Sequence, residues 1–184
     1  MIDSPESAMN AAADEVRDLV VAAQQGDQGA FGELYRKFAR MVHGMLLSRI
    51  PPAEVEDLVQ EVFLSALRKL KDLREPAAFG SWVAMIARNR AADFYRDRLE
   101  STELTENHAS SSPGAPARID AVTVLEVIQG LPEAYRETLV LRLVEGMTGP
   151  EIAERTGLGH GSVRVNLHRG MELLREALEK GVQR

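Results

Sequence analysis

Polar and basic side chains gather in the last third of the chain, on a helix predicted from residue 160 onward. A second predicted helix, over 149–156, precedes it, and the turn Gly157-Leu158-Gly159 joins the two. Two helices joined by a tight turn can lay the second helix in the major groove of DNA. There arginine can pair with guanine, asparagine with adenine, and an apolar side chain with the thymine methyl. The candidate DNA-reading residues are His160, Ser162, Arg164, Val165, Asn166, His168 and Arg169.

Local signals support this helix-turn-helix. Thr148 and Glu151 have the spacing of a capping box, which would open the first helix. Gly157 is placed to end that helix in a left-handed turn. The alternative is a helical bundle whose last two helices meet by chance.

A second candidate surface is acidic. The segment 54–63 places Glu56, Asp57, Gln60 and Glu61 on one polar helix face, opposite an apolar one. An acidic face on a chain with basic patches elsewhere indicates a basic protein partner. The simpler interpretation is a solvated helix face.

A third candidate surface mixes aromatic and basic residues over 79–96. Trp82, Asn89 and Arg96 are seven residues apart and share one helical stripe. Such a helix can stack unpaired bases and hold phosphate, as single-stranded nucleic acid requires. In the alternative interpretation, Trp82 and Phe94 belong to the core and the arginines are solvated.

The rest of the sequence predicts an all-α protein of two helical domains. Its 184 residues are 45% hydrophobic and 5% aromatic, which favours helix over strand. We expect a disordered tail over 1–13, a first domain over 14–99, a flexible linker over 100–120 rich in Ser, Ala and Pro, and a second domain over 121–184. Helices are expected to begin near residues 14, 28, 53 and 77 in the first domain, and near 121, 132, 149 and 160 in the second.

Composition also excludes several classes. No apolar run is long enough to span a membrane, and the acidic N-terminus is not a secretory signal, so we expect a cytoplasmic protein. No cysteine is present, which rules out disulfides and thiolate metal sites. The net charge of −6 argues against a protein that holds nucleic acid by bulk electrostatics. We expect no catalytic residue, metal or cofactor, because the four histidines are scattered and no catalytic or phosphate-loop pattern occurs.

Together these motifs resemble the extracytoplasmic-function group of the sigma-70 family, the specificity subunits of bacterial RNA polymerase. The resemblance covers about 14–99 and 121–180. It rests on the run from Glu56 to Phe63, on Phe79-x-x-Trp82 followed by Ile86-Ala87-Arg88-Asn89, on Leu131-Pro132, and on the helix-turn-helix that ends at Arg169.

The resemblance implies a role for each surface. The acidic helix with Glu56, Asp57, Gln60 and Glu61 would bind core RNA polymerase, and the second domain would read the duplex −35 element. The first domain would recognise and open the −10 element with the loop before residue 79 and the helix after it, through Arg74, Phe79, Trp82, Arg88, Asn89, Arg90 and Arg96. The linker would thread between the domains, and an anti-sigma factor is an expected partner. No membrane insertion and no small-molecule substrate are implied.

The chain departs from the family pattern at the recognition helix. Gly159 stands where the family has a serine cap, and Gly170-Met171-Glu172 follow where basic residues are usual. These departures predict weaker binding at the −35 element. Three other functions fit the sequence less well: a self-sufficient helix-turn-helix repressor or activator, a protein-interaction adaptor, and a carboxylate-dependent hydrolase. A repressor or activator would need a dimer interface or a ligand domain, and neither is apparent in the sequence. An adaptor would leave the DNA-reading residues without a use, and a hydrolase would need clustered ligands.

Overall fold

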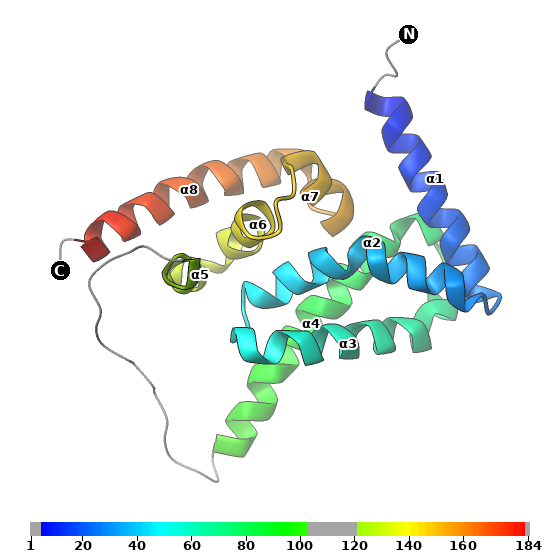
Figure 1. Cartoon of the computed structure of the whole chain (residues 1–184), viewed down its shortest axis with the longest axis horizontal. Coiled ribbons are helices and arrows are strands. Elements are labelled where there is room, and N and C mark those ends of the chain that lie inside the picture. The colour runs from blue at the N-terminus through cyan, green and yellow to red at the C-terminus, as the bar shows by residue number, and fades with distance from the viewer. Residues whose placement is uncertain (1–4, 103–120, 183–184) are drawn as a thin grey trace.

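A computed structural model describes residues 5–102 and 121–182. Within these ranges the chain is helical and no strand occurs, which confirms the predicted all-α class (Figure 1). The first group of helices is α1 (Pro5–Gln24), α2 (Gln28–Leu47), α3 (Pro52–Lys69) and α4 (Phe79–Thr102), with the 3-10 turns η1 (Leu70–Asp72) and η2 (Pro76–Ala78) between α3 and α4. The second group is α5 (Ala121–Gly130), α6 (Glu133–Leu143), α7 (Gly149–Thr156) and α8 (His160–Val182).

Local chemistry sets the ends of the helices in the first group. Gly26 adopts a φ of 101°, a conformation that favours glycine, and so turns the chain between α1 and α2. Asp27 then caps α2 by accepting a hydrogen bond from the Ala30 N–H at 3.1 Å. Pro52 occupies the first turn of α3, where its missing N–H costs nothing.

The structure differs from the sequence-based expectation at two helix ends. Helix α1 begins at Pro5, whereas a disordered tail was expected over 1–13. The alanines at positions 8 and 11–13 are strong helix formers, so they extend the helix without adding an apolar stripe. Helix α4 continues to Thr102, three residues into the expected linker, and the remainder of that linker, 103–120, lies outside the described residues.

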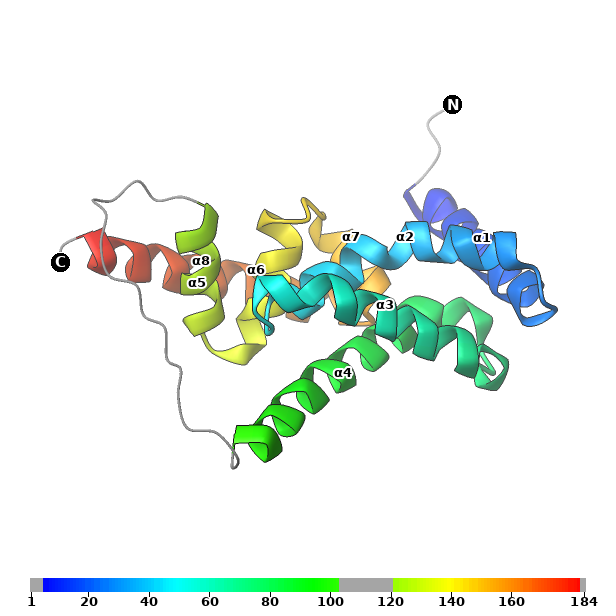
Figure 2. The same ribbon diagram turned by 60° about the horizontal axis from the view of Figure 1, so that its bottom comes forward.

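The two groups of helices pack against each other. Helices α6 and α7 lie on α2, and α7 also contacts α4 (Figures 1 and 2). The buried apolar side chains form one continuous cluster, from Val20 in α1 to Leu174 in α8. Burial of apolar surface is the dominant favourable contribution to folding, so this cluster stabilises the packed arrangement of both groups.

Candidate nucleic-acid interface

The helix-turn-helix forms as the local sequence signals predict. Thr148 Oγ1 accepts from the Glu151 N–H at 3.4 Å, and the Glu151 carboxylate accepts from the Thr148 N–H at 2.7 Å, which completes the capping box. The hydrogen bonds from the backbone and side chain of Thr148 lower the pKa of Glu151. Gly157 ends α7 with a φ of 75°, and α8 begins three residues later. Because Val163 and Ile152 are buried between the helices, the angle between them is held by apolar packing.

The opposite face of α8 is open to solvent. Val165 is 48% exposed, so its side chain is accessible to a partner. Asn166 is half-buried and lines a groove of about 340 Å³ shared with Arg49 in the turn after α2, Arg88 of α4 and Glu133 of α6. The expected reading residues that are exposed are His160, Ser162, Arg164, Val165, His168 and Arg169.

Helix α3 has one acidic exposed face and one buried apolar face. The four expected polymerase-binding side chains, Glu56, Asp57, Gln60 and Glu61, are all exposed. They lie opposite the buried residues Val55, Leu58, Val59, Val62, Phe63 and Ala66. The acidic residues are therefore available to a partner and are not part of the core.

Helix α4 and the loop before it hold the expected −10 residues. Arg74 lies exposed between η1 and η2, and Asn89 and Arg96 are exposed on α4. Trp82 and Arg90 are partly buried, and Arg90 Nε lies 2.5 Å from the Glu61 carboxylate. Arg90 therefore also joins α4 to the acidic helix.

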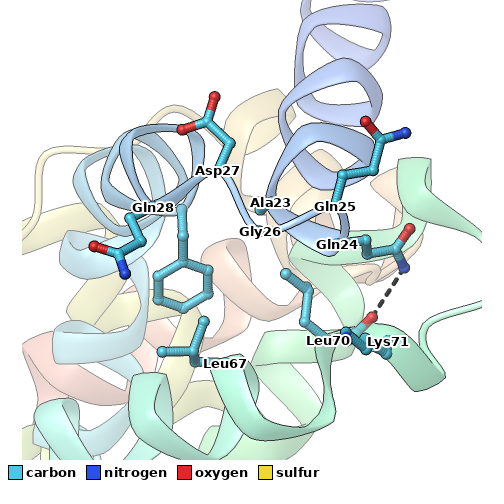
Figure 3. Close-up of a pocket in the computed structure, with 10 residues that line it drawn as sticks. Ala23, Gln24, Gln25, Gly26, Asp27, Gln28, Leu67, Leu70 and Lys71 are labelled. Carbon is cyan, nitrogen blue, oxygen red and sulfur yellow. Dashed lines mark hydrogen bonds between the residues drawn. The ribbon is translucent and has the colours of Figure 1, made fainter.

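Gln24 fixes the loop that carries Arg74. Its amide nitrogen donates to the carbonyl oxygens of Leu70 and Leu73, each at 2.9 Å. Figure 3 shows Gln24 pointing toward Leu70 at the rim of an open groove of about 490 Å³ between the α1–α2 turn and the end of α3. Helix α1 therefore anchors the start of the loop, although sequence reasoning assigned it no part in the site.

Phe79 was expected to face DNA, and the structure corrects this. Its side chain is 0% exposed, with ring centroids 5.2 Å from Phe38 and 5.8 Å from Trp82. A fully buried ring cannot contact DNA in this structure. Phe79 instead supports the half-exposed indole of Trp82 from beneath.

Met85 was not among the expected −10 residues. Its side chain is 50% exposed and falls three residues after Trp82 and four before Asn89, on the same helical stripe. The spacing alone could have found it. Partly buried Trp82 and exposed Met85, Asn89 and Arg96 thus lie along one stripe of α4, which we call the α4 stripe.

Arg88 lies away from this stripe and faces the second group of helices. Its Nε and Nη2 donate to the two carboxylate oxygens of Glu137 in α6, at 3.1 and 2.7 Å. Arg49 Nη1 donates to the same carboxylate at 3.1 Å. The structure therefore brings an expected −10 residue to the second group rather than to the α4 stripe.

Two sequence-family models match the chain: sigma-70 region 2 over residues 34–99 and sigma-70 region 4 over residues 121–174. The RNA polymerase sigma factor CarQ of Myxococcus xanthus is 35% identical over 161 residues, which cover 84% of this chain and 92% of CarQ. The chain belongs to the sigma-70 family. The ECF RNA polymerase sigma-E factor of Escherichia coli K12 is 30% identical over 181 residues, covering 90% of this chain and 93% of that protein. These matches confirm the resemblance to the extracytoplasmic-function group.

A solved structure supports the same fold. CnrH, in complex with the cytosolic domain of CnrY, superposes with a TM-score of 0.61 at 26% identity, covering 90% of this chain and 98% of CnrH. As a sigma factor, the protein binds core RNA polymerase and directs promoter-specific transcription initiation. In the described part of the chain, no helix is long and apolar enough to cross a membrane.

Proposed function

We propose that three separate surfaces divide the work of this sigma factor: the acidic face of α3 docks on core polymerase, α4 with its preceding loop engages the −10 element, and α8 reads the −35 element. The observation that carries the proposal is that all three surfaces remain exposed beside one shared core. A solvent-exposed side chain on a helix whose other face is packed in the core is available to a partner.

The acidic face would dock on a basic surface of the polymerase. Asp57 and Gln60 are exposed and appear in no ion pair or hydrogen bond that the structure describes. Their neighbours Glu56 and Glu61 point toward His43 and Arg90, at 3.8 and 2.5 Å. Asp57 and Gln60 are therefore the members of the face that a partner can engage without first breaking an internal contact.

The α4 stripe and Arg74 would hold the melted −10 element. The indole of Trp82 offers a flat apolar surface on which an unpaired base can stack, and the thioether of Met85 lies three residues further along the same stripe. Asn89 and Arg96 would supply hydrogen bonds and phosphate contacts along the same line. Phe79 would not contact DNA. Its buried ring would position Trp82.

Helix α8 would enter the major groove at the −35 element with its first turns. Arg164 and Val165 are adjacent and exposed, as reading guanine and a thymine methyl requires. The backbone at the start of α8 has no side-chain cap from Gly159, and the Val163 N–H donates to the Gly159 carbonyl oxygen at 3.0 Å. Binding at this element would therefore depend on polymerase holding the domain in place.

We also propose that the chain acts in the cytoplasm, where polymerase works, that it has no catalytic site of its own, and that an anti-sigma factor controls it. CnrH is described with CnrY, and the sigma factor RpoE of Bartonella quintana with the anti-sigma factor NepR. The RpoE comparison, at 20% identity, supports the fold alone.

The test is the double variant Asp57→Arg with Gln60→Ala, titrated against core polymerase. We expect at least a tenfold loss of core affinity with unchanged helical content. Asp18→Arg is the matched control, since Asp18 is an exposed carboxylate on α1 outside the three surfaces. Equal losses in both proteins, or no loss in the double variant, would remove α3 from the docking surface.

A further inference from the structure

Gln24, the last residue of α1, uses its side-chain amide to hold the loop between α3 and α4. Its Nε2 lies 2.9 Å from the Leu70 carbonyl oxygen and 2.9 Å from the Leu73 carbonyl oxygen. A glutamine amide nitrogen has two N–H donors, so these two bonds use both of them. Turning the amide over would place its oxygen against two acceptors. The side chain is therefore fixed in the orientation that Figure 3 shows, with the amide toward Leu70.

The end of α1 that carries Gln24 is itself held by the core. Val20 lies four residues earlier, on the same stripe of the helix, and is 0% exposed. Leu19 and Ala23 pack against the same apolar cluster. Helix α1 also contacts both η1 and η2, on either side of the loop. Gln24 therefore links the loop to a fixed point of the core and not to another mobile surface side chain.

The two carbonyl groups that Gln24 binds lie where the chain leaves regular structure. The Leu70 carbonyl oxygen also accepts a hydrogen bond from the Leu73 N–H at 3.1 Å, which closes the turn η1. Leu73 then has extended backbone angles, φ −72° and ψ 104°, and the next turn, η2, begins only at Pro76. The Leu73 carbonyl oxygen accepts from Gln24, a residue 49 positions away in the sequence. A contact with a distant helix thus sets the direction in which the loop leaves η1.

The Leu73 carbonyl belongs to the peptide group from which Arg74 begins. A peptide group is planar, so its carbonyl oxygen, its nitrogen and the two flanking Cα atoms move together. Leu73 is 8% exposed, so its side chain anchors one end of this plane, and the bond to Gln24 anchors the oxygen. The nitrogen and Cα of Arg74 are therefore held in place, while the Arg74 side chain itself is exposed.

An open groove beside Gln24 separates its effect on the loop from its effect on stability. The groove, of about 490 Å³, is lined by Gln24, Leu70 and Lys71 among others (Figure 3). Water in such a groove can replace a missing amide as donor to the two carbonyl oxygens. Water is not attached to α1, however, so it would satisfy the carbonyl groups without fixing their position. Removal of the Gln24 amide should therefore release the loop at little cost to the folded state.

We propose that Gln24 is a positioning residue for base selection at the −10 element, because it fixes the peptide group between Leu73 and Arg74. The proposal rests on the proposed function of Arg74 and the α4 stripe at that element. Gln24 itself would contact neither DNA nor polymerase. A loop held in one conformation presents one arrangement of side chains to an unpaired base, whereas a loop that samples several conformations discriminates less between bases.

The test measures base selection by the full-length chain with core polymerase. Transcription is run on a promoter library randomised over the −35 and −10 elements, and the templates that yield transcripts are sequenced. Gln24→Leu keeps a similar size and removes both donors, so we expect selectivity at one or more −10 positions to fall at least fivefold. Preference at −35 and core affinity should stay within twofold of wild type. The matched control is Gln25→Leu, the exposed neighbour, which should keep the wild-type −10 profile.

Two further substitutions of Gln24 separate positioning from a general loss of folding. Gln24→Lys retains N–H donors at the end of a stem of similar reach and should restore most of the selectivity. Gln24→Glu has nearly the same shape but no donor, and it should behave like Gln24→Leu. The urea midpoint of Gln24→Leu should fall by only about 0.5 M, since hydrogen bonds that water can replace contribute little net stability.

The results that would overturn the proposal are specific. An unchanged −10 profile in Gln24→Leu would do so, as would equal losses of −10 selectivity, −35 preference and core affinity in that variant. Selectivity in Gln24→Lys as low as in Gln24→Leu would have the same consequence. Arg74→Ala reports the proposed function separately. If it changes the −10 profile while Gln24→Leu does not, the loop stays at the −10 element and only the positioning role is lost; an unchanged profile in Arg74→Ala would remove Arg74 from that element.

Discussion

Replacing Phe79 distinguishes a core residue from a DNA contact. The ring is fully buried and forms two aromatic contacts, with Phe38 and Trp82. Truncation of a buried phenylalanine to alanine costs about 3–5 kcal/mol, because apolar burial is lost and a cavity remains. The change to leucine keeps most of the apolar volume and should cost less than about 1.5 kcal/mol.

Urea unfolding, followed by far-ultraviolet circular dichroism, measures these costs. With a slope of about 2 kcal/mol per molar urea, a loss of about 4 kcal/mol lowers the unfolding midpoint of Phe79→Ala by roughly 2 M. The matched control is Met85→Ala on the same helix, whose half-exposed side chain should contribute about 0.5 kcal/mol or less.

Because the Phe79 ring is buried, Phe79→Leu should retain −10 opening, whereas Met85→Ala should weaken it. Permanganate reactivity of unpaired thymines in the complex with polymerase measures that opening. If Phe79→Ala unfolded at the wild-type urea concentration and Phe79→Leu lost promoter opening, the ring would contact DNA and its assignment to the core would be wrong.

Three further predictions concern the second group of helices and its contact with the first. Thr148→Ala removes the capping box with Glu151 and should lower the free energy of unfolding by about 0.5–2 kcal/mol in urea titrations, whereas an unchanged midpoint would contradict the role of the cap. The hydrogen bond that His43 donates to the Glu145 carboxylate, followed by the charges of Glu145 and Glu56, raises the pKa of His43 despite partial burial. The protonated form therefore stabilises the packed arrangement fully below pH 6.5, and this stability should be lost as pH rises through the raised pKa; a urea midpoint with no such decrease, relative to His43→Gln, would contradict the contact. Arg164→Ala should weaken −35 binding by about 1–3 kcal/mol in footprinting with polymerase, and an equal loss in the control Arg175→Ala would indicate a general charge effect.

Much of the fold could be predicted because its signals are local. The apolar stripes of α2 and α3, the proline at the start of α3, the capping box before α7 and the left-handed Gly157 each act within a few residues. Such signals do not depend on the rest of the chain, so the helices form close to where the sequence indicates. The start of α1 was missed because alanines favour a helix without forming a stripe.

The parts that could not be predicted depend on contacts between distant residues. Phe79 and Trp82 are both aromatic and three residues apart, and Phe79 is the more buried of the two because it packs against distant residues such as Phe38. Likewise, no local pattern joins Arg88 to Glu137, which are 49 residues apart. Periodicity marks a polar position on a helix, but it does not say whether water, DNA or another helix covers it.

Residues that bind polymerase or read DNA must be exposed to solvent. The sequence pattern predicted that exposure for most of them. Asp57, Gln60 and Arg164 lie on faces opposite buried stripes, as helical periodicity requires. Asn166 is half-buried because the second group packs on the first and leaves it beside a shared groove.

Runoff transcription tests the central claim most directly. The chain is mixed with core RNA polymerase on a pooled library of promoter-length DNA fragments, with core alone and chain alone as references. We predict discrete transcripts only when both proteins are present, and their loss in the variant Asp57→Arg with Gln60→Ala. Tight binding of duplex DNA by the chain alone, with no transcripts added to those of core polymerase, would contradict the account.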